Sequence, residues 1–359
     1  MDEETSIKIQ MIRSMLAHKD YQGVIVQSQL NLAWLTGGRF FVNIASQMGI
    51  GAIFIGPDCV ELIVNNVEGE RLWHEEGVNR ICEQVRTYPW YAEDEKDKLV
   101  QTLSEGLRVA NDEQLAEEFL QMRLVLTPFE QKQYQILGRL AGEVVERTAQ
   151  EFGRGETEYQ IAARMAKASC ELGMEPVVCL VGGDMRAKTY RHPLPTDNVV
   201  QDYALLVLSA RKWGLVASVS RAVHFGRISA ELAAKQQAVI EVDAAMLAAT
   251  RRGVSLGSVF KIGQDAYARA GFPGEWQYHH QGGIAGYQSR EAKATPDATR
   301  LIQTGQALAW NPTIQGAKSE DTVLLTEQGL QMLTFSGNFP SQKVRVGELE
   351  LSRSLILER

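Results

Sequence analysis

The stretch Gln201–Arg221, QDYALLVLSARKWGLVASVSR, reads as two apolar segments joined by a tight connection. Its first apolar run, Tyr203–Leu208, and its second, Leu215–Ser220, are short and bounded by polar or glycine residues, which is typical of core strands. Residues 210–214 connect the two runs. The sequence therefore predicts a buried β-hairpin.

Helix signals precede the hairpin and follow it. Thr127-Pro128-Phe129-Glu130 has the pattern of a capping box with proline at the first helical position, and Thr157-Glu158-Tyr159-Gln160 repeats the capping chemistry. We expect these two helices to be followed by a strand at Val177–Val181, the hairpin, and helices at Ser229–Arg251 and Leu256–Ala270. The C-terminal part then has the composition of strands.

The chain before Thr127 alternates strand and helix patterns, which is typical of a mixed α/β domain. At 359 residues, two domains are the natural expectation. We predict an α+β protein with one domain at residues 1–124 and a second at residues 125–359.

Composition excludes several partners. The net charge of −7 and the lack of any basic run argue against binding to nucleic acid. The acidic start, MDEET, has no apolar segment after it, and no stretch is long enough to cross a bilayer, so we expect a cytoplasmic protein without a membrane partner. The four cysteines have no CxxC spacing, which argues against a disulfide framework or a thiolate metal site.

The order of elements and two local motifs resemble the pita-bread family of methionine and Xaa-Pro aminopeptidases, prolidases and creatinase. The run Gly316–Val323, GAKSEDTV, is close to that family's closing motif, and His279–Gly286 lies over its His-x-x-Gly-His-Gly-x-Gly motif. Residues 1–124 resemble the small N-terminal domain of its creatinase and prolidase members. The resemblance implies an N-terminal creatinase-like α/β domain, a C-terminal pita-bread domain and a homodimer.

The family holds two metal ions at five positions, and most of these have changed here. By the resemblance they fall on Val207, Ser218, Gly283, Asn311 and Glu320. Valine and glycine have no donor side chain, whereas two divalent ions need several carboxylates and imidazoles. The histidine of the family's His-Glu pair has become Arg290 beside Glu291. We therefore expect no metal pair at this site, and no cofactor.

Two residues remain as candidates for catalysis. His192, in Tyr190–Pro195, matches a family histidine in the loop before the hairpin; in creatinase, the metal-free member, such a histidine is assigned acid–base work. An imidazole can donate and accept a proton near neutral pH. Without metal, Glu320 either accepts hydrogen bonds from a cationic or amide-bearing ligand or forms a buried salt bridge with nearby cations, among them Lys318.

Further residues beside these motifs are candidates for ligand contact. They are His279, His280, Arg290, Glu291, Arg221, Asn311, Trp213 and Trp310. A core position is an open alternative for the tryptophans, and for the histidines so is a position in the core or one that supports a residue in contact with the ligand. His279 overlays a family histidine and His280 has no such counterpart. Ser209, Ser218 and Cys179 could be nominated as nucleophiles, but no nucleophile-elbow sequence surrounds them.

Three functional hypotheses remain. The favoured one is a metal-independent hydrolase or lyase that acts on a small C–N-containing metabolite and uses His192 as acid and base. The second is an inactive pseudopeptidase that binds a peptide or protein. The third is a metallo-aminopeptidase with a displaced metal site.

Overall fold

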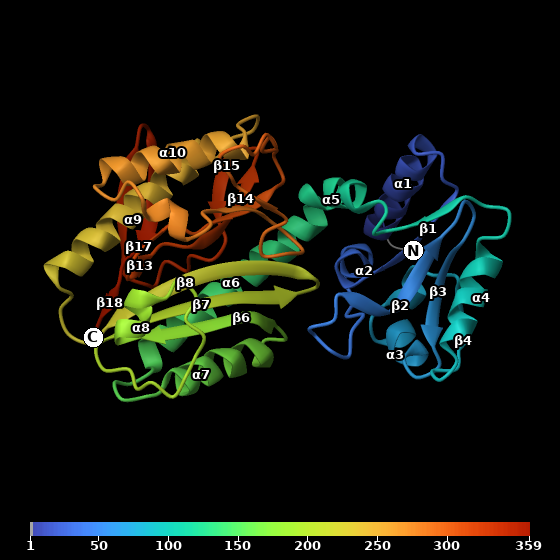
Figure 1. Ribbon diagram of the computed structural model, residues 1–359, viewed down its shortest axis with the longest axis horizontal. Coiled ribbons are helices and arrows are strands. Elements are labelled where there is room, and N and C mark those ends of the chain that lie inside the picture. The colour runs from blue at the N-terminus through green and yellow to red at the C-terminus, as the bar shows by residue number, and fades with distance from the viewer. Residues whose placement is uncertain (1–2) are drawn as a thin grey trace. The chain divides into compact units, whose positions relative to one another are not determined.

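The computed structural model describes residues 3–359. The chain forms two compact units, which divide between Arg123 and Leu124. Both contain helices and sheets (Figure 1), as the α+β prediction requires. Each unit has its own sheets and its own buried apolar core.

The first unit is built on a five-stranded sheet with the order β4-β3-β2-β1-β5. β1 and β3 each pair with β2 in antiparallel fashion, while the outer strands β5 and β4 pair in parallel. Its strands are β1 (Gly23–Ser28), β2 (Met48–Ile55), β3 (Val60–Asn65), β4 (Gln84–Tyr88) and β5 (Val109–Asn111). Its helices are α1 (Glu3–His18), α2 (Gln29–Thr36), α3 (Gly69–His74), η1 (Val78–Arg80), α4 (Glu93–Leu103) and α5 (Ala116–Leu124).

The second unit contains a four-stranded sheet, β18-β8-β7-β6, and a five-stranded sheet, β10-β9-β11-β14-β15. The strands of the first are β6 (Glu175–Gly183), β7 (Tyr203–Lys212), β8 (Leu215–His224) and β18 (Leu357–Glu358). Those of the second are β9 (Gly282–Ala285), β10 (Ala292–Lys293), β11 (Ala307–Trp310), β14 (Asp321–Thr326) and β15 (Gly329–Met332). Two pairs stand apart: β12 (Thr313–Ile314) with β13 (Ala317–Lys318), and β16 (Ser341–Val346) with β17 (Leu349–Ser354).

Long helices cover these sheets. α6 packs on β7 and β8, and α7 packs on β6 (Figure 1). The helices of this unit are α6 (Pro128–Glu151), α7 (Glu158–Glu171), α8 (Asp184–Thr189), α9 (Ala230–Ala249), α10 (Leu256–Arg269) and η2 (Glu275–Tyr278). Both predicted capping boxes are confirmed: Thr127 and Glu130 exchange hydrogen bonds at the start of α6, and Thr157 and Gln160 do so at the start of α7.

The predicted hairpin is confirmed, but it is longer than the sequence suggested. β7 and β8 continue to Lys212 and His224, so the connection is only the two-residue turn Trp213-Gly214. Both turn residues have positive φ angles, 53° and 80°, which suit the right-handed twist of a tight hairpin. Residues 203–210 and 215–223 are all buried, which explains why the strands read as continuous apolar runs.

The register of the hairpin determines which side chains share a face. Val207 pairs with Ser220 and Ser209 pairs with Ser218. Because side chains alternate along a strand, these four lie on the same face of the sheet. The positions expected to carry the family's two aspartates, Val207 and Ser218, are therefore brought together.

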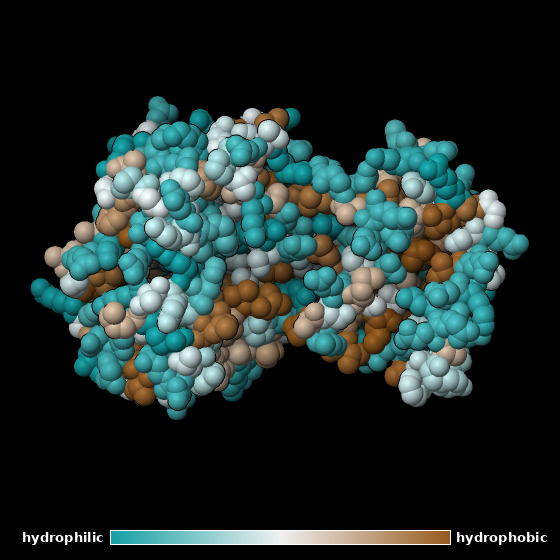
Figure 2. Space-filling model, viewed as in Figure 1, coloured by the Kyte–Doolittle hydropathy of each residue, from teal (hydrophilic) through white to brown (hydrophobic). Residues whose placement is uncertain are grey.

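Figure 2 shows a face on which hydrophilic residues predominate, with apolar residues in smaller groups. Among residues 3–359 there is no helix long and apolar enough to cross a membrane.

Candidate functional site

The five positions that correspond to the family's metal ligands do not provide a ligand set. Val207 has no donor atom, and Ser218 uses its hydroxyl in a 2.9 Å hydrogen bond with Ser209. At Gly283 the backbone itself excludes a side chain. β9 lies between β10 and β11, and a Cβ atom added to Gly283 would lie 2.0 Å from the carbonyl oxygen of Ala292.

Glu320, the one carboxylate retained, is held by two cations. The Nζ atom of Lys318 lies 2.8 Å from one carboxylate oxygen, and a guanidinium nitrogen of Arg290 lies 3.0 Å from the other. Ser220 also donates a hydrogen bond to Glu320. All three charged side chains are nearly inaccessible, with 2%, 6% and 4% of the Lys318, Arg290 and Glu320 side chains exposed.

These charges determine the ionisation of Glu320. Burial by itself would raise the pKa of the carboxyl group, but Lys318 and then Arg290 oppose it, and hydrogen bonds from Lys318 and Ser220 add to their effect. The result is a pKa well below the ordinary value, so Glu320 is ionised. Arg290 also reaches the Ser218 hydroxyl over 3.3 Å, which ties the hairpin to the second sheet.

The residues present do not fit the family's pair of divalent ions. A dinuclear centre needs several anionic or imidazole donors, and here both oxygens of Glu320 already bind positively charged side chains. Asn311 contributes an amide where the family has a carboxylate. It is buried, and its Oδ1 atom has no hydrogen-bond partner within the described chain.

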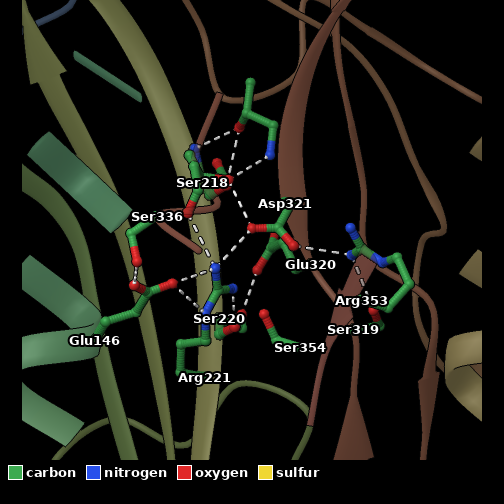
Figure 3. A network of polar contacts seen from close by, with 12 residues as sticks. Glu146, Ser218, Ser220, Arg221, Ser319, Glu320, Asp321, Ser336, Arg353 and Ser354 are labelled. Atoms are coloured by element: carbon green, nitrogen blue, oxygen red, sulfur yellow. Dashed lines mark hydrogen bonds and ion pairs between the residues drawn. The ribbon is translucent and has the colours of Figure 1, made fainter. Parts of the chain in front are cut away.

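A second buried network lies beside Glu320 and includes Arg221. Arg221 bonds to Glu146 over 2.8 Å and to Asp321 over 3.0 Å, and its side chain is fully buried. Arg353 bonds to Asp321 over 3.0 Å and also pairs with Asp243. Figure 3 shows Arg221 and Arg353 reaching Asp321 from opposite sides. Arg221, one of the candidates for ligand contact, thus has a position in this ion-pair network.

Sequence reasoning missed Glu146, Asp243 and Arg353, because they come from α6, α9 and β17, far apart in the chain. A signal for Asp321 was available. It follows Glu320 directly, inside the run Gly316–Val323 that the sequence had already singled out.

Three histidines, His192, His279 and His280, lie close together and form a second group of candidate residues. His192 lies in the loop between α8 and β7, while His279 and His280 lie between η2 and β9. The Nε2 atoms of His192 and His279 are 3.0 Å apart, so one ring donates a hydrogen bond to the other. The rings of His279 and His280 stack with centroids 4.6 Å apart. The structure thus brings together all three histidines that the sequence singled out.

The histidines are neutral at physiological pH. Burial, with Lys318 next in importance, lowers the pKa of His279 to about 2 and also lowers the pKa of His192. Burial and Arg290 lower the pKa of His280 to about 4. His279 is buried, His280 is half-buried and His192 is exposed, so solvent reaches the cluster at His192.

The remaining candidates lie elsewhere in the packing. Trp310 is fully buried in β11 and donates to the Thr250 hydroxyl, which is the core position left open as the alternative to ligand contact. Trp213 lies in the hairpin turn beside the Lys212 ammonium. Glu291 accepts a hydrogen bond from the backbone N–H of Tyr287. Burial raises the pKa of the Cys179 thiol to about 11, which is unsuitable for a nucleophile.

Comparison with known proteins places this fold and sequence in a family. The model of metallopeptidase family M24 matches residues 132–327, which is more than half of the chain. An uncharacterised peptidase of Staphylococcus haemolyticus is 22% identical over 355 residues, covering 91% of this chain and 98% of the relative.

Solved structures show the same fold. The X-Pro aminopeptidase of Thermotoga maritima matches with a TM-score of 0.79 and 17% identity over 98% of this chain and 99% of that one. The prolidase of Pyrococcus horikoshii matches with a TM-score of 0.76 and 16% identity over 92% and 98%. The N-terminal domain of the FACT complex subunit SPT16 from Cicer arietinum matches with a TM-score of 0.70 and 9% identity over 93% and 95%.

The resemblance predicted from the sequence motifs is therefore confirmed, and so is the two-domain α+β pita-bread fold. This chain belongs to the metallopeptidase family M24.

Proposed function

We propose that this protein is a metal-independent hydrolase or lyase that cleaves a small C–N-containing metabolite, with His192 as acid and base. The observation that carries the proposal is the neutral, solvent-exposed imidazole of His192, which lies 3.0 Å from the His279 ring. A neutral imidazole can accept a proton, and its neighbour His279 can fix its orientation.

In a hydrolysis, His192 accepts a proton from water while the water oxygen forms a bond to the carbon. The C–N bond then breaks, and His192 returns the proton to the leaving nitrogen. The family's metal pair has no part in these steps. Because both oxygens of Glu320 bind cations, the proposal gives Glu320 a positioning role: it holds Lys318 and Arg290 in the site.

The test is a screen of guanidino compounds, small amides and Xaa-Pro dipeptides with tag-free protein dialysed against EDTA. We expect turnover of a C–N compound that persists in the presence of the chelator and is lost in His192→Ala. His18→Gln, on the exposed end of α1, is the matched control and keeps full activity. Equal turnover by His192→Ala would remove the proposal.

A second candidate is a catalytically inactive pseudopeptidase that binds a peptide or protein. The observation in its favour is the neutralised carboxylate: Glu320 is already paired with Lys318 and Arg290 and is not free to activate water. Calorimetric titration with short peptides separates the two. Binding without turnover of any compound in the screen supports the pseudopeptidase, and turnover dependent on His192 contradicts it.

The third hypothesis, a metallo-aminopeptidase with a displaced site, predicts dipeptide cleavage that EDTA abolishes and Mn²⁺ or Co²⁺ restores.

We further propose that the protein is a homodimer, as the family resemblance implies, which light scattering tests directly. We also predict that the protein binds a small molecule or a short peptide. The absence of nucleic-acid and membrane partners stays a prediction from the sequence.

A further inference from the structure

Half of the chain's six histidines lie in one cluster. One possible ligand atom from each of His192, His279 and His280 lies within 4.8 Å of the other two, and the Nε2 atoms of His192 and His279 are 3.0 Å apart. Three imidazoles on a tetrahedral Zn²⁺, each with a Zn–N distance of about 2.1 Å, have nitrogens about 3.4 Å apart. The widest separation therefore has to close by at most about 1.4 Å. The exposed His192 side chain can supply this movement.

Two nitrogen atoms of the cluster lack a partner. The Nδ1 atoms of His279 and His280 are buried and make no hydrogen bond with any residue in the range 3–359. A buried polar atom without a partner lowers stability, so native structures usually supply one. A metal ion that accepts an imidazole lone pair is one such partner.

The protonation state also suits a metal. A histidine binds a metal through its neutral imidazole, and a protonated ring must first release its proton. Burial and the nearby cations Lys318 and Arg290 keep these rings neutral at pH 7. No net release of a proton is needed when an ion binds, although the ring that donates the Nε2–H in the His192–His279 hydrogen bond has to move that proton to its Nδ1 atom.

We propose that His192, His279 and His280 form a mononuclear Zn²⁺ site that is distinct from the metal pair of the M24 family. Imidazole ligands select Zn²⁺ and similar transition metals, whereas Mg²⁺ and Ca²⁺ require oxygen donors. The nearest carboxylate described above, Glu320, is already bound to Lys318 and Arg290.

This inference goes beyond the proposed function and has one consequence for it. In the proposed hydrolysis, His192 uses the lone pair of its neutral ring to accept a proton from water. Zn²⁺ bound to His192 occupies that lone pair. Bound Zn²⁺ therefore inhibits turnover, and EDTA relieves the inhibition.

The experiment is equilibrium dialysis of tag-free, EDTA-stripped protein against Zn²⁺, followed by elemental analysis. We expect one Zn²⁺ per chain. His192→Gln and His280→Gln each raise the Kd by on the order of a hundredfold, since even the loss of a residue that only supports a ligand costs up to that much. His18→Gln is the matched control and binds as the parent protein does. Co²⁺ in place of Zn²⁺ gives the visible absorption of a tetrahedral site, which His280→Gln abolishes.

Unchanged Zn²⁺ binding in both cluster variants overturns the proposal, and so does a stoichiometry near zero in the parent protein. Loss of Zn²⁺ in a folded Glu320→Gln variant also overturns it, because the ion then sits at the family's own ligand position. If Zn²⁺ binds at the histidines and turnover requires it, the site stands and the metal-independent mechanism fails. The two proposals are thus separable.

Discussion

The guanidinium of Arg290 lies 3.0 Å from the carboxylate of Glu320, in a site from which almost all solvent is excluded. By the sequence resemblance, Arg290 falls on the position of a family histidine and Glu320 on that of a family metal ligand. With Lys318 on the other oxygen, two side-chain cations surround the only carboxylate retained from the ligand set. The negative charge of Glu320 is therefore compensated by Lys318 and Arg290.

Removing the negative charge of Glu320 from its ion pairs with Lys318 and Arg290 is expected to destabilise the protein strongly. Glu320→Gln leaves Lys318 and Arg290 buried without a counter-charge, which should cost about 3–5 kcal/mol in free energy of unfolding. Urea denaturation followed by circular dichroism measures the change. The exposed Glu327→Gln is the control and should shift stability by less than about 0.5 kcal/mol.

Replacing all three charged residues, Glu320, Lys318 and Arg290, should lower the free energy of unfolding less than replacing Glu320 alone. In a triple variant Glu320→Leu, Arg290→Met and Lys318→Met, no buried charge is left unpaired, so the loss is expected to be smaller than for Glu320→Gln alone. A larger loss in the triple variant would show that the ion pairs themselves stabilise the fold.

The same carboxylate makes stability depend on pH. Its pKa in the folded protein lies below the ordinary value of 4.5, so the stabilisation is fully present above pH 4.5. It is lost as the pH falls through the lowered pKa, because the unfolded chain then binds the proton more readily. We expect the stability difference between the parent protein and Glu320→Gln to be constant above about pH 4.5 and to shrink as the pH falls below it. Urea midpoints at several pH values measure it, and a constant difference would contradict the assignment.

Restoring a histidine at position 283 should not restore a metal site. Gly283 has a φ of 150°, and a Cβ atom there would lie 2.0 Å from the carbonyl oxygen of Ala292. Gly283→His therefore forces a backbone shift in a central strand and should lower stability by several kcal/mol or prevent folding. Gly274→Ala is the control, because its added methyl group meets nothing within 4 Å. Soluble expression and thermal unfolding give the result.

Arg221 is expected to act on stability alone. Arg221→Met leaves the buried carboxylates of Glu146 and Asp321 without this cation and should cost about 3–5 kcal/mol. By contrast, Arg139→Met removes an exposed pair with Glu143 and should cost less than about 1 kcal/mol. A folded Arg221→Met variant with a raised KM and unchanged stability would instead indicate a ligand contact.

Local patterns in the sequence were sufficient for the elements that determine the fold. The apolar runs of β7 and β8 and the capping residues Thr127 and Thr157 act over a few neighbouring positions, so their structural consequence can be read directly. The length of the hairpin was underestimated, because Ser209–Lys212 is polar in sequence and yet continues the strand against β6.

The sequence by itself, through the family resemblance, also predicted which donors are missing from the metal site, since a valine or a glycine has no ligand side chain in any fold. Which side chains surround Glu320 was decided only in three dimensions. Lys318, Arg290 and Ser220 meet Glu320 from separate strands and loops, and His192 meets His279 across 87 residues. Such contacts depend on how the sheets pack, and charge or periodicity along the chain carries no record of that packing.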